Sequence, residues 1–292
     1  MKLTGSIVAL ITPFDNAGKV NFDKLGELIE WHIENGTDGI LVLGTTGEAV
    51  TMSHDENVAV VKYAVERVAG RVLVIAGSGS NSTSAMLEKS LEYQGLGVDA
   101  LLLISPYYNK ANPEGMYRHF KTVADGVSIP CILYNVPGRT GCAIPESVVA
   151  RLSTHPNIMG IKEASGDIGY AAKVARYVTD DFALYSGNDD QVLPILALGG
   201  SGVISVFANV KPKETHDMVE SFLSGNMEYA RKIQLGYLSL INALFMEVNP
   251  IPVKAAMNLM GMNVGEYRLP LYPMSDDNCR RLAGIMKECG LR

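Results

Sequence analysis

The chain has 292 residues, of which 47% are hydrophobic and 19% are charged, so it can bury a large core and is not intrinsically disordered. Its formal net charge of −6 argues against a surface that binds nucleic acid or an anionic membrane, and we expect neither partner. The sequence has no run of about 18 apolar residues that could span a bilayer.

The cysteines and the N-terminus indicate a cytoplasmic protein. The first apolar run reaches Pro13 after only a short distance from Met1, which does not fit a secretory signal. The cysteines show neither a CxxC motif nor metal-ligand spacing, so we expect reduced thiols and no metal site; they are Cys131, Cys142, Cys279 and Cys289.

Short apolar, β-branched runs alternate with helical patterns along most of the chain. Near-continuous apolar strands are typical of a parallel sheet that is buried on both faces and covered by helices. No GxGxxG follows the first run, and eight runs favour a (β/α)8 TIM barrel over an open doubly wound sheet. The predicted strands are 6–12, 39–43, 72–76, 100–104, 131–134, 157–165, 182–185 and 202–205, and helical patterns cover 22–34, 55–68, 84–96 and 113–124.

The C-terminal part of the chain contains only helical patterns. They begin near Lys211 and are interrupted by Gly225, Pro250, Pro252 and Pro270. We therefore predict a catalytic barrel over residues 1–224 and a helical extension over residues 225–292 that packs on it.

A lysine and a tyrosine stand where two neighbouring predicted strands end. Lys162 lies in the sixth run and Tyr134 closes the fifth, and active sites of barrel enzymes lie at this end of the strands. A partly desolvated lysine has more free amine to attack a carbonyl, and a tyrosine can pass a proton when it is held in a hydrogen-bond chain. The pair therefore suggests imine chemistry on a carbonyl substrate.

Each of these features also has a simpler explanation. Lys162 and Tyr134 could be ordinary strand-end residues, with the lysine ammonium in water. The loop 44–47 could cradle a phosphate, although it lacks the lysine of a P-loop. Residues 54–56 (His-Asp-Glu) could bind a metal, but Ser53 followed by acidic residues is more typical of a helix N-terminus.

Two interpretations of the Arg139 guanidinium are also open. It could pair with a surface carboxylate, or it could bind a substrate carboxylate in bidentate fashion from a loop held by Pro137 and two glycines.

Three segments together resemble a known family. Residues 44–48 (GTTGE), 134–141 (YNVPGRTG) and 160–164 (GIKEA) are similar to motifs of the pyruvate-dependent class I aldolase/N-acetylneuraminate lyase family, and the similarity extends over essentially the whole chain. Arg139 within its Pro-Gly-Arg-Thr-Gly motif favours the dihydrodipicolinate synthase branch of that family.

The resemblance implies a function and a set of roles. Lys162 would form an imine with pyruvate, Tyr134 would transfer protons, and Thr45 would link Tyr134 to Tyr108. The product of condensation with L-aspartate 4-semialdehyde would be 4-hydroxy-tetrahydrodipicolinate, the first committed step of lysine and diaminopimelate biosynthesis, with no cofactor and no metal. The implied substrate-binding residues are Thr45, Thr46, Arg139, Gly187 and Ile204.

Two other functions remain open at this stage. A pyruvate-dependent aldolase for a 2-keto-3-deoxy sugar acid or sialic acid uses the same lysine, but it favours hydroxyl-binding residues where Arg139 stands. A non-catalytic binding barrel would be expected to lose Lys162 or Tyr134, and both are present.

The resemblance also implies assembly and regulation. Such enzymes are homotetramers, dimers of dimers, in which the counterpart of Tyr108 reaches into the neighbouring site. Relatives inhibited by lysine bind it with groups that fall at Ala49, His54, Asn57, Asn81, Ala85 and Tyr107. Because Ala49, Asn57 and Ala85 depart from the Ser, His and Glu of that pattern, we expect weak or absent lysine inhibition. Asn188 stands where relatives often carry an acid, and we assign it no role.

Overall fold

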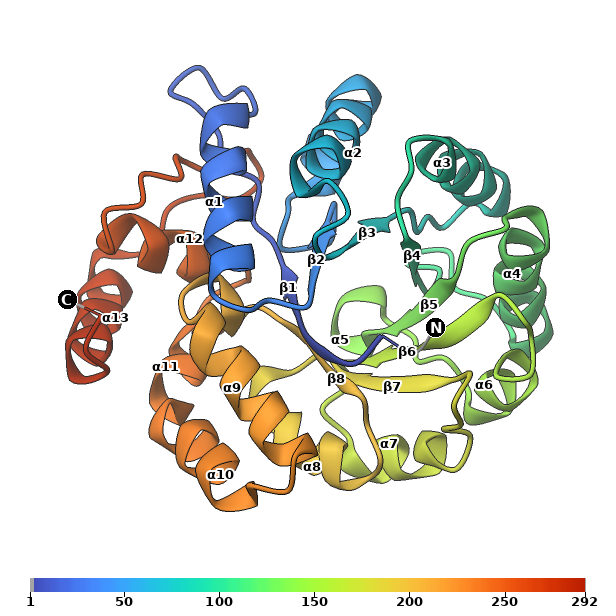
Figure 1. Cartoon of the computed structure of the whole chain (residues 1–292). Helices are drawn as coiled ribbons and strands as arrows, with labels where there is room; N and C mark the ends of the chain where they lie inside the picture. The colour runs from blue at the N-terminus through green and yellow to red at the C-terminus, as the bar shows by residue number, and fades with distance from the viewer. Residues whose placement is uncertain (1–2, 292) are drawn as a thin grey trace.

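The computed structural model describes residues 3–291, so Met1 and Lys2, the first residues of the segment considered above as a signal, lie outside the described residues, as does Arg292. Eight parallel strands close into a barrel in the order β1 to β8, with helices around it (Figure 1). The predicted (β/α)8 barrel is confirmed.

The strands follow the predicted apolar runs closely. The first is shorter than predicted: β1 ends at Ala9, because the N–H of Ile11 donates to the side chain of Asn209 rather than continuing the strand. The strands are β1 (Gly5–Ala9), β2 (Gly39–Val42), β3 (Leu73–Gly77), β4 (Ala100–Ile104), β5 (Cys131–Asn135), β6 (Ile158–Glu163), β7 (Ala183–Ser186) and β8 (Gly202–Ser205).

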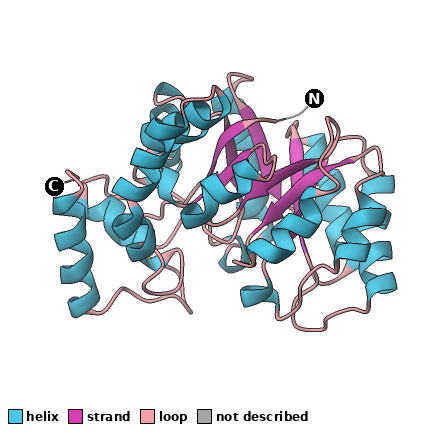
Figure 2. Ribbon diagram, turned by 90° about the horizontal axis from the view of Figure 1, so that it is seen from below, coloured by secondary structure: helices cyan, strands magenta, loops and turns pink. Residues whose placement is uncertain are grey.

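Helices cover the outside of the barrel and continue beyond it. Figure 2 shows the strands at the centre and a group of C-terminal helices at one side. The helices are α1 (Phe22–Glu34), α2 (His54–Val68), α3 (Thr83–Gly95), α4 (Pro113–Gly126), α5 (Pro137–Thr140), α6 (Glu146–Leu152), α7 (Ile168–Ala175), α8 (Val192–Ala197), α9 (Pro212–Leu223), α10 (Met227–Gly236), α11 (Leu238–Ala243), α12 (Ile251–Leu259) and α13 (Asp276–Glu288).

Side chains alternate between the barrel interior and the helix layer, as the two-residue period of a strand requires. In β5, Ile132 and Tyr134 belong to the interior cluster, whereas Leu133 packs in the layer between strands and helices. In β6, Ile161 packs in that outer layer, so the next residue, Lys162, faces inward. The alternation therefore aims the lysine and the tyrosine at the same interior.

The C-terminal extension is tied to the barrel by a buried ion pair. Lys254 of α12 is fully buried, and its ammonium lies 2.9 Å from a carboxylate oxygen of Glu48, in the loop after β2. The ammonium also donates to the carbonyls of Thr12 and Glu266, so all three of its hydrogens have acceptors. Breaking such a pair would leave an uncompensated buried charge, which makes it a strong constraint on where α12 sits.

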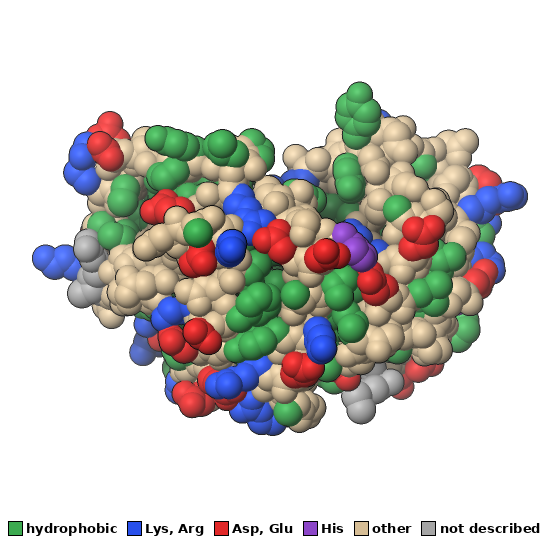
Figure 3. All heavy atoms as spheres, turned by 90° about the horizontal axis from the view of Figure 1, so that it is seen from above, with side chains coloured by type: hydrophobic (Ala, Val, Ile, Leu, Met, Phe, Trp, Pro, Cys, Tyr) green, Lys and Arg blue, Asp and Glu red, His purple; other side chains and the backbone are tan. Residues whose placement is uncertain are grey.

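Basic and acidic side chains are interspersed on the face seen in Figure 3, without a cluster of Lys and Arg there. Hydrophobic side chains gather along the upper edge of that view, on either side of a notch. Within residues 3–291, no helix combines the length and the apolar character needed to cross a membrane.

Candidate active site

Lys162 and Tyr134 lie together at the end of neighbouring strands. They are register partners between β5 and β6, and the Lys162 Nζ atom lies 4.6 Å from the centre of the Tyr134 ring. Both side chains are buried, with exposed fractions of 5% and 8%. The alternative interpretation, that Lys162 is a strand-end lysine with its ammonium in water, is therefore wrong.

Burial changes the ionisation of both groups. It lowers the pKa of Lys162 to about 8; the Asp189 carboxylate opposes this shift, and the Arg139 guanidinium adds to it. Burial raises the pKa of Tyr134, an effect that Arg139 and a hydrogen bond with Thr45 partly offset. At neutral pH the site thus holds a protonated phenol beside a lysine with an appreciable fraction of free amine.

The loop after β2 brings Thr45 and Thr46 to the same cavity. The N–H groups of Gly47 and Glu48 donate to the carbonyls of Gly44 and Thr45, so these two donors are not free to cradle a phosphate. Thr45 and Thr46 line the cavity and bring two side-chain hydroxyls to this loop.

Arg139 sits on α5, the single helical turn that follows β5. One guanidinium nitrogen donates to the backbone carbonyl of Asn249 at 3.0 Å. Within residues 3–291 the guanidinium has no carboxylate partner, so the surface ion pair considered above is wrong. Its other donors are left for the carboxylate of a ligand.

These residues converge on one cavity of about 70 Å³, whose wall includes Gly187. A β-carbon at Gly187 would lie 2.6 Å from the Ala164 side chain and 3.0 Å from Cε of Lys162, so only glycine leaves the lysine in place. Ile204 is fully buried in the barrel wall and is not among the residues that line the cavity. The cavity is lined by Ala9, Leu41, Gly44, Thr45, Thr46, Leu102, Tyr134, Val136, Arg139, Lys162, Ala164, Gly187, Asn188, Val206, Phe245 and Asn249.

Two buried polar residues of the site were missed by the sequence reasoning. Asp189 accepts hydrogen bonds from the hydroxyl of Ser205 and from the N–H groups of Val206 and Phe207, and its charge acts on Lys162. Asn249 reaches the cavity from the C-terminal extension. Asp189 follows the end of β7, so its position in the sequence could have identified it, whereas Asn249 belongs to the C-terminal extension and no local pattern marks it.

A second cavity, of about 170 Å³, shares Thr45 and Tyr134 with the first. Tyr107 and Lys89 also line it. Tyr108, in contrast, is 91% exposed and is not among the residues that line either cavity.

The residues implied in regulation lie around this second cavity and on nearby helices. Ala49 and Tyr107 line it, and the side chains of Asn57 and Asn81 donate to the carbonyls of Ala49 and Tyr107, respectively. Ala85 is exposed on α3.

His54, Asp55 and Glu56 are not brought together as a group of metal ligands. His54 lies 3.2 Å from Glu92. Ser53 is the N-cap of α2, as the sequence predicted, and it forms a reciprocal capping box with Glu56. Among the described residues, no group of three His, Cys, Asp or Glu side chains is arranged to hold a metal ion.

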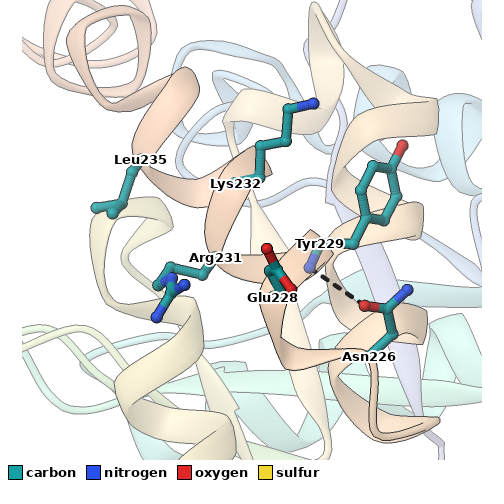
Figure 4. Close-up of a pocket in the computed structure, with 6 residues that line it drawn as sticks. All are labelled: Asn226, Glu228, Tyr229, Arg231, Lys232 and Leu235. Carbon is teal, nitrogen blue, oxygen red and sulfur yellow. Dashed lines mark hydrogen bonds between the residues drawn. The ribbon is translucent and has the colours of Figure 1, made fainter.

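A larger hollow, of about 360 Å³, lies on the outer surface of α10 (Figure 4). All six residues that line it are exposed, and the interaction drawn there is the N-cap bond from the Tyr229 N–H to the Asn226 side chain. It offers no buried ionisable group, so the 70 Å³ cavity is the better candidate for chemistry.

Comparison with known proteins agrees with the geometry. Residues 2–289 match the family described as the dihydrodipicolinate synthetase family. A 4-hydroxy-tetrahydrodipicolinate synthase of Thermoanaerobacter sp. (strain X514) is 54% identical over 288 residues, covering 98% of this chain and 97% of that protein.

Solved structures of dihydrodipicolinate synthases superpose on the whole fold. The Acinetobacter baumannii enzyme, described as chloride-inhibited and complexed with pyruvate, has a TM-score of 0.97 at 40% identity and covers 100% of both chains. The Cyanidioschyzon merolae enzyme with lysine bound has a TM-score of 0.96 at 40% identity and covers 99% of both. The chain belongs to the dihydrodipicolinate synthetase family.

Proposed function

We propose that this protein condenses pyruvate with L-aspartate 4-semialdehyde to form 4-hydroxy-tetrahydrodipicolinate through a Schiff base at Lys162. The observation that carries the proposal is the buried Lys162 amine, 4.6 Å from the Tyr134 ring centre, in a cavity that Arg139 also lines. Membership of the family and whole-chain similarity to synthases support it. The sugar-acid aldolase alternative is not favoured by these relatives.

Each group has a proposed task in this reaction. The free amine of Lys162 attacks C2 of pyruvate, and Tyr134 donates a proton to the departing hydroxyl, so that water leaves and the imine forms. Loss of a proton from the pyruvate methyl group gives an enamine, whose carbon attacks the aldehyde. The amine of the second substrate then displaces Lys162 and closes the ring.

The remaining polar groups hold the substrates. Thr45 and Thr46 bind the carboxylate of pyruvate, and Arg139 binds the carboxylate of the aldehyde substrate, for which its unpaired donors are suited. Gly187 and Ile204 contribute through backbone groups, and for Ile204 this role rests on family resemblance alone.

We also propose a homotetramer made of two dimers, located in the cytoplasm. The exposed side chains of Val50 and Tyr108, 90% and 91% exposed, lie on the loops around the 170 Å³ cavity and support an interface there. The mostly apolar walls of that cavity, next to Thr45 and Tyr134, suit the ring of a partner's tyrosine. The four unpaired cysteines fit a reducing compartment.

Borohydride reduction with pyruvate tests the chemistry. We expect the reduced pyruvate adduct on Lys162, located by peptide mass mapping, and no adduct in Lys162→Ala. Lys254 is an internal control, because it is also buried but is ion-paired, and all three of its hydrogens have acceptors. An adduct on Lys254, or turnover of sugar-acid aldehydes in preference to aspartate 4-semialdehyde, would contradict the proposal.

The rate of imine formation should depend on pH in a defined direction. Because burial lowers the pKa of Lys162 to about 8, the neutral amine and the trapping rate should increase with pH and level off above that value. Arg139→Met removes a positive charge that lowers this pKa, so the midpoint should move to higher pH. Arg231→Met, at an exposed arginine, is the control and should leave the midpoint unchanged. A wild-type midpoint near the usual pKa of lysine would contradict a desolvated amine.

Co-expression of two inactive variants tests whether Tyr108 acts across an interface. Tyr108→Ala keeps Lys162, and Lys162→Ala keeps Tyr108. If Tyr108 serves the neighbouring site, hybrid dimers contain one complete site and recover activity above the sum of the separate variants. Activity no greater than that sum would mean that Tyr108 serves its own subunit.

Inhibition by lysine should be weak or absent. Ala85 lacks a carboxylate, which removes a charge-assisted contact with the ligand ammonium and lowers affinity about tenfold or more. The half-buried Lys89 also lines the cavity that contains Ala49 and Tyr107, and it would repel a second ammonium. Calorimetry should detect no sub-millimolar binding by the wild type and stronger binding by Ala85→Glu/Lys89→Leu. Sub-millimolar binding by the wild type would refute this expectation.

A further inference from the structure

Asn249 joins the two groups that we assign to the carboxylates of the two substrates. Its side-chain Nδ2 donates to the Thr46 hydroxyl at 3.0 Å, and its backbone carbonyl accepts from the Arg139 guanidinium at 3.0 Å. Asn249 is 5% exposed and lines the same cavity as both partners. One residue of the C-terminal extension therefore contacts both binding groups, which come from different loops of the barrel.

We infer that Asn249 is a positioning residue for substrate binding: its side chain orients the Thr46 hydroxyl toward the carboxylate of pyruvate, and its backbone carbonyl holds Arg139 for the aldehyde. The inference rests on the proposed function and extends it to a residue outside the catalytic set.

The direction of the hydrogen bond between Asn249 and Thr46 determines what the Thr46 hydroxyl can do. The Thr46 oxygen accepts from Asn249, so the hydroxyl hydrogen of Thr46 remains free to donate to a carboxylate in the cavity. The Oδ1 atom of Asn249 is buried and has no hydrogen-bond partner among residues 3–291. The bond from Nδ2 to Thr46 is thus the polar contact that fixes the amide.

Neighbouring contacts hold Asn249 itself in place. Two helical elements flank it, α11 and α12, and α12 is anchored by the ion pair of Lys254 with Glu48. Glu48 lies two residues after Thr46 on the same loop. The extension therefore holds this loop at two points, one of which is Asn249.

The two contacts of Asn249 can be separated by mutation. A side-chain substitution removes the bond to Thr46 but keeps the backbone carbonyl that holds Arg139. In Asn249→Leu we expect the KM for pyruvate to rise about fivefold to tenfold, as for the loss of one hydrogen bond, with kcat and the KM for the aldehyde changing less than about twofold. Asn242→Leu, at an exposed asparagine on α11, is the matched control.

A double-mutant cycle tests whether Asn249 acts through Thr46. In a Thr46→Val background, Asn249→Leu should raise the KM for pyruvate by less than about a further twofold, because the hydrogen bond between the two residues is already lost. Asn249→Asp, which keeps the shape but only accepts hydrogen bonds, should raise the KM for pyruvate more than Asn249→Leu does, because it takes up the hydroxyl hydrogen of Thr46.

The outcomes separate this inference from the proposed function. Additive effects in the cycle, equal increases in both KM values, or no change in Asn249→Leu would overturn the positioning role. Failure of wild-type protein to form the Lys162 adduct with pyruvate would instead overturn the proposed function. If Asn249→Leu does not fold, as judged by circular dichroism, the smaller Asn249→Ser replaces it in the same cycle, with the same criteria.

Discussion

The buried ion pair between Lys254 and Glu48 is the constraint on which the geometry of the site depends. Two charges without access to water are tolerated only when they are paired and the remaining donors are satisfied, and here they are. The backbone N–H of Arg268 donates to the second oxygen of Glu48. Because Glu48 follows directly on the threonine loop, the pair fixes that loop relative to α12.

The loop conformation itself requires this support. Leu43 and Glu48, at the two ends of the loop, both have positive φ, 57° and 53°, a region that side chains other than glycine adopt at a cost of about 1–3 kcal/mol. Contacts from outside the loop must offset that cost. The hydroxyl of Thr12, the amide of Asn249 and the ammonium of Lys254 provide them.

The fold could be predicted from the sequence because a strand that is buried on both faces is a continuous run of apolar residues. The apolar runs located all eight strands, and strand alternation accounts for the inward direction of Lys162 and Tyr134. The short helices α5 to α8 were not predicted individually, since a helix of four to eight residues gives little periodicity.

Within the site, residues close to a strand end could be predicted from the sequence, and a residue distant from any strand could not. Residues at strand ends, such as Lys162, Tyr134 and Arg139, could be placed because topology alone brings them together. Asp189 follows the end of β7 and could have been placed in the same way, although the sequence analysis missed it. Asn249 could not, because its place in the site depends on its bond to Thr46, which no local pattern encodes. Ile204 is a different case: resemblance suggested it, and it lies in the wall rather than on the cavity surface.

The tight fit at Gly187 limits how this catalyst could be redesigned. Any larger residue there would collide with the carbon chain of Lys162 and with Ala164. A route to new aldehyde specificity, in the laboratory or through evolution, would have to leave this wall unchanged. Variation is better accommodated at Arg139, which is exposed and is held by the backbone of another segment.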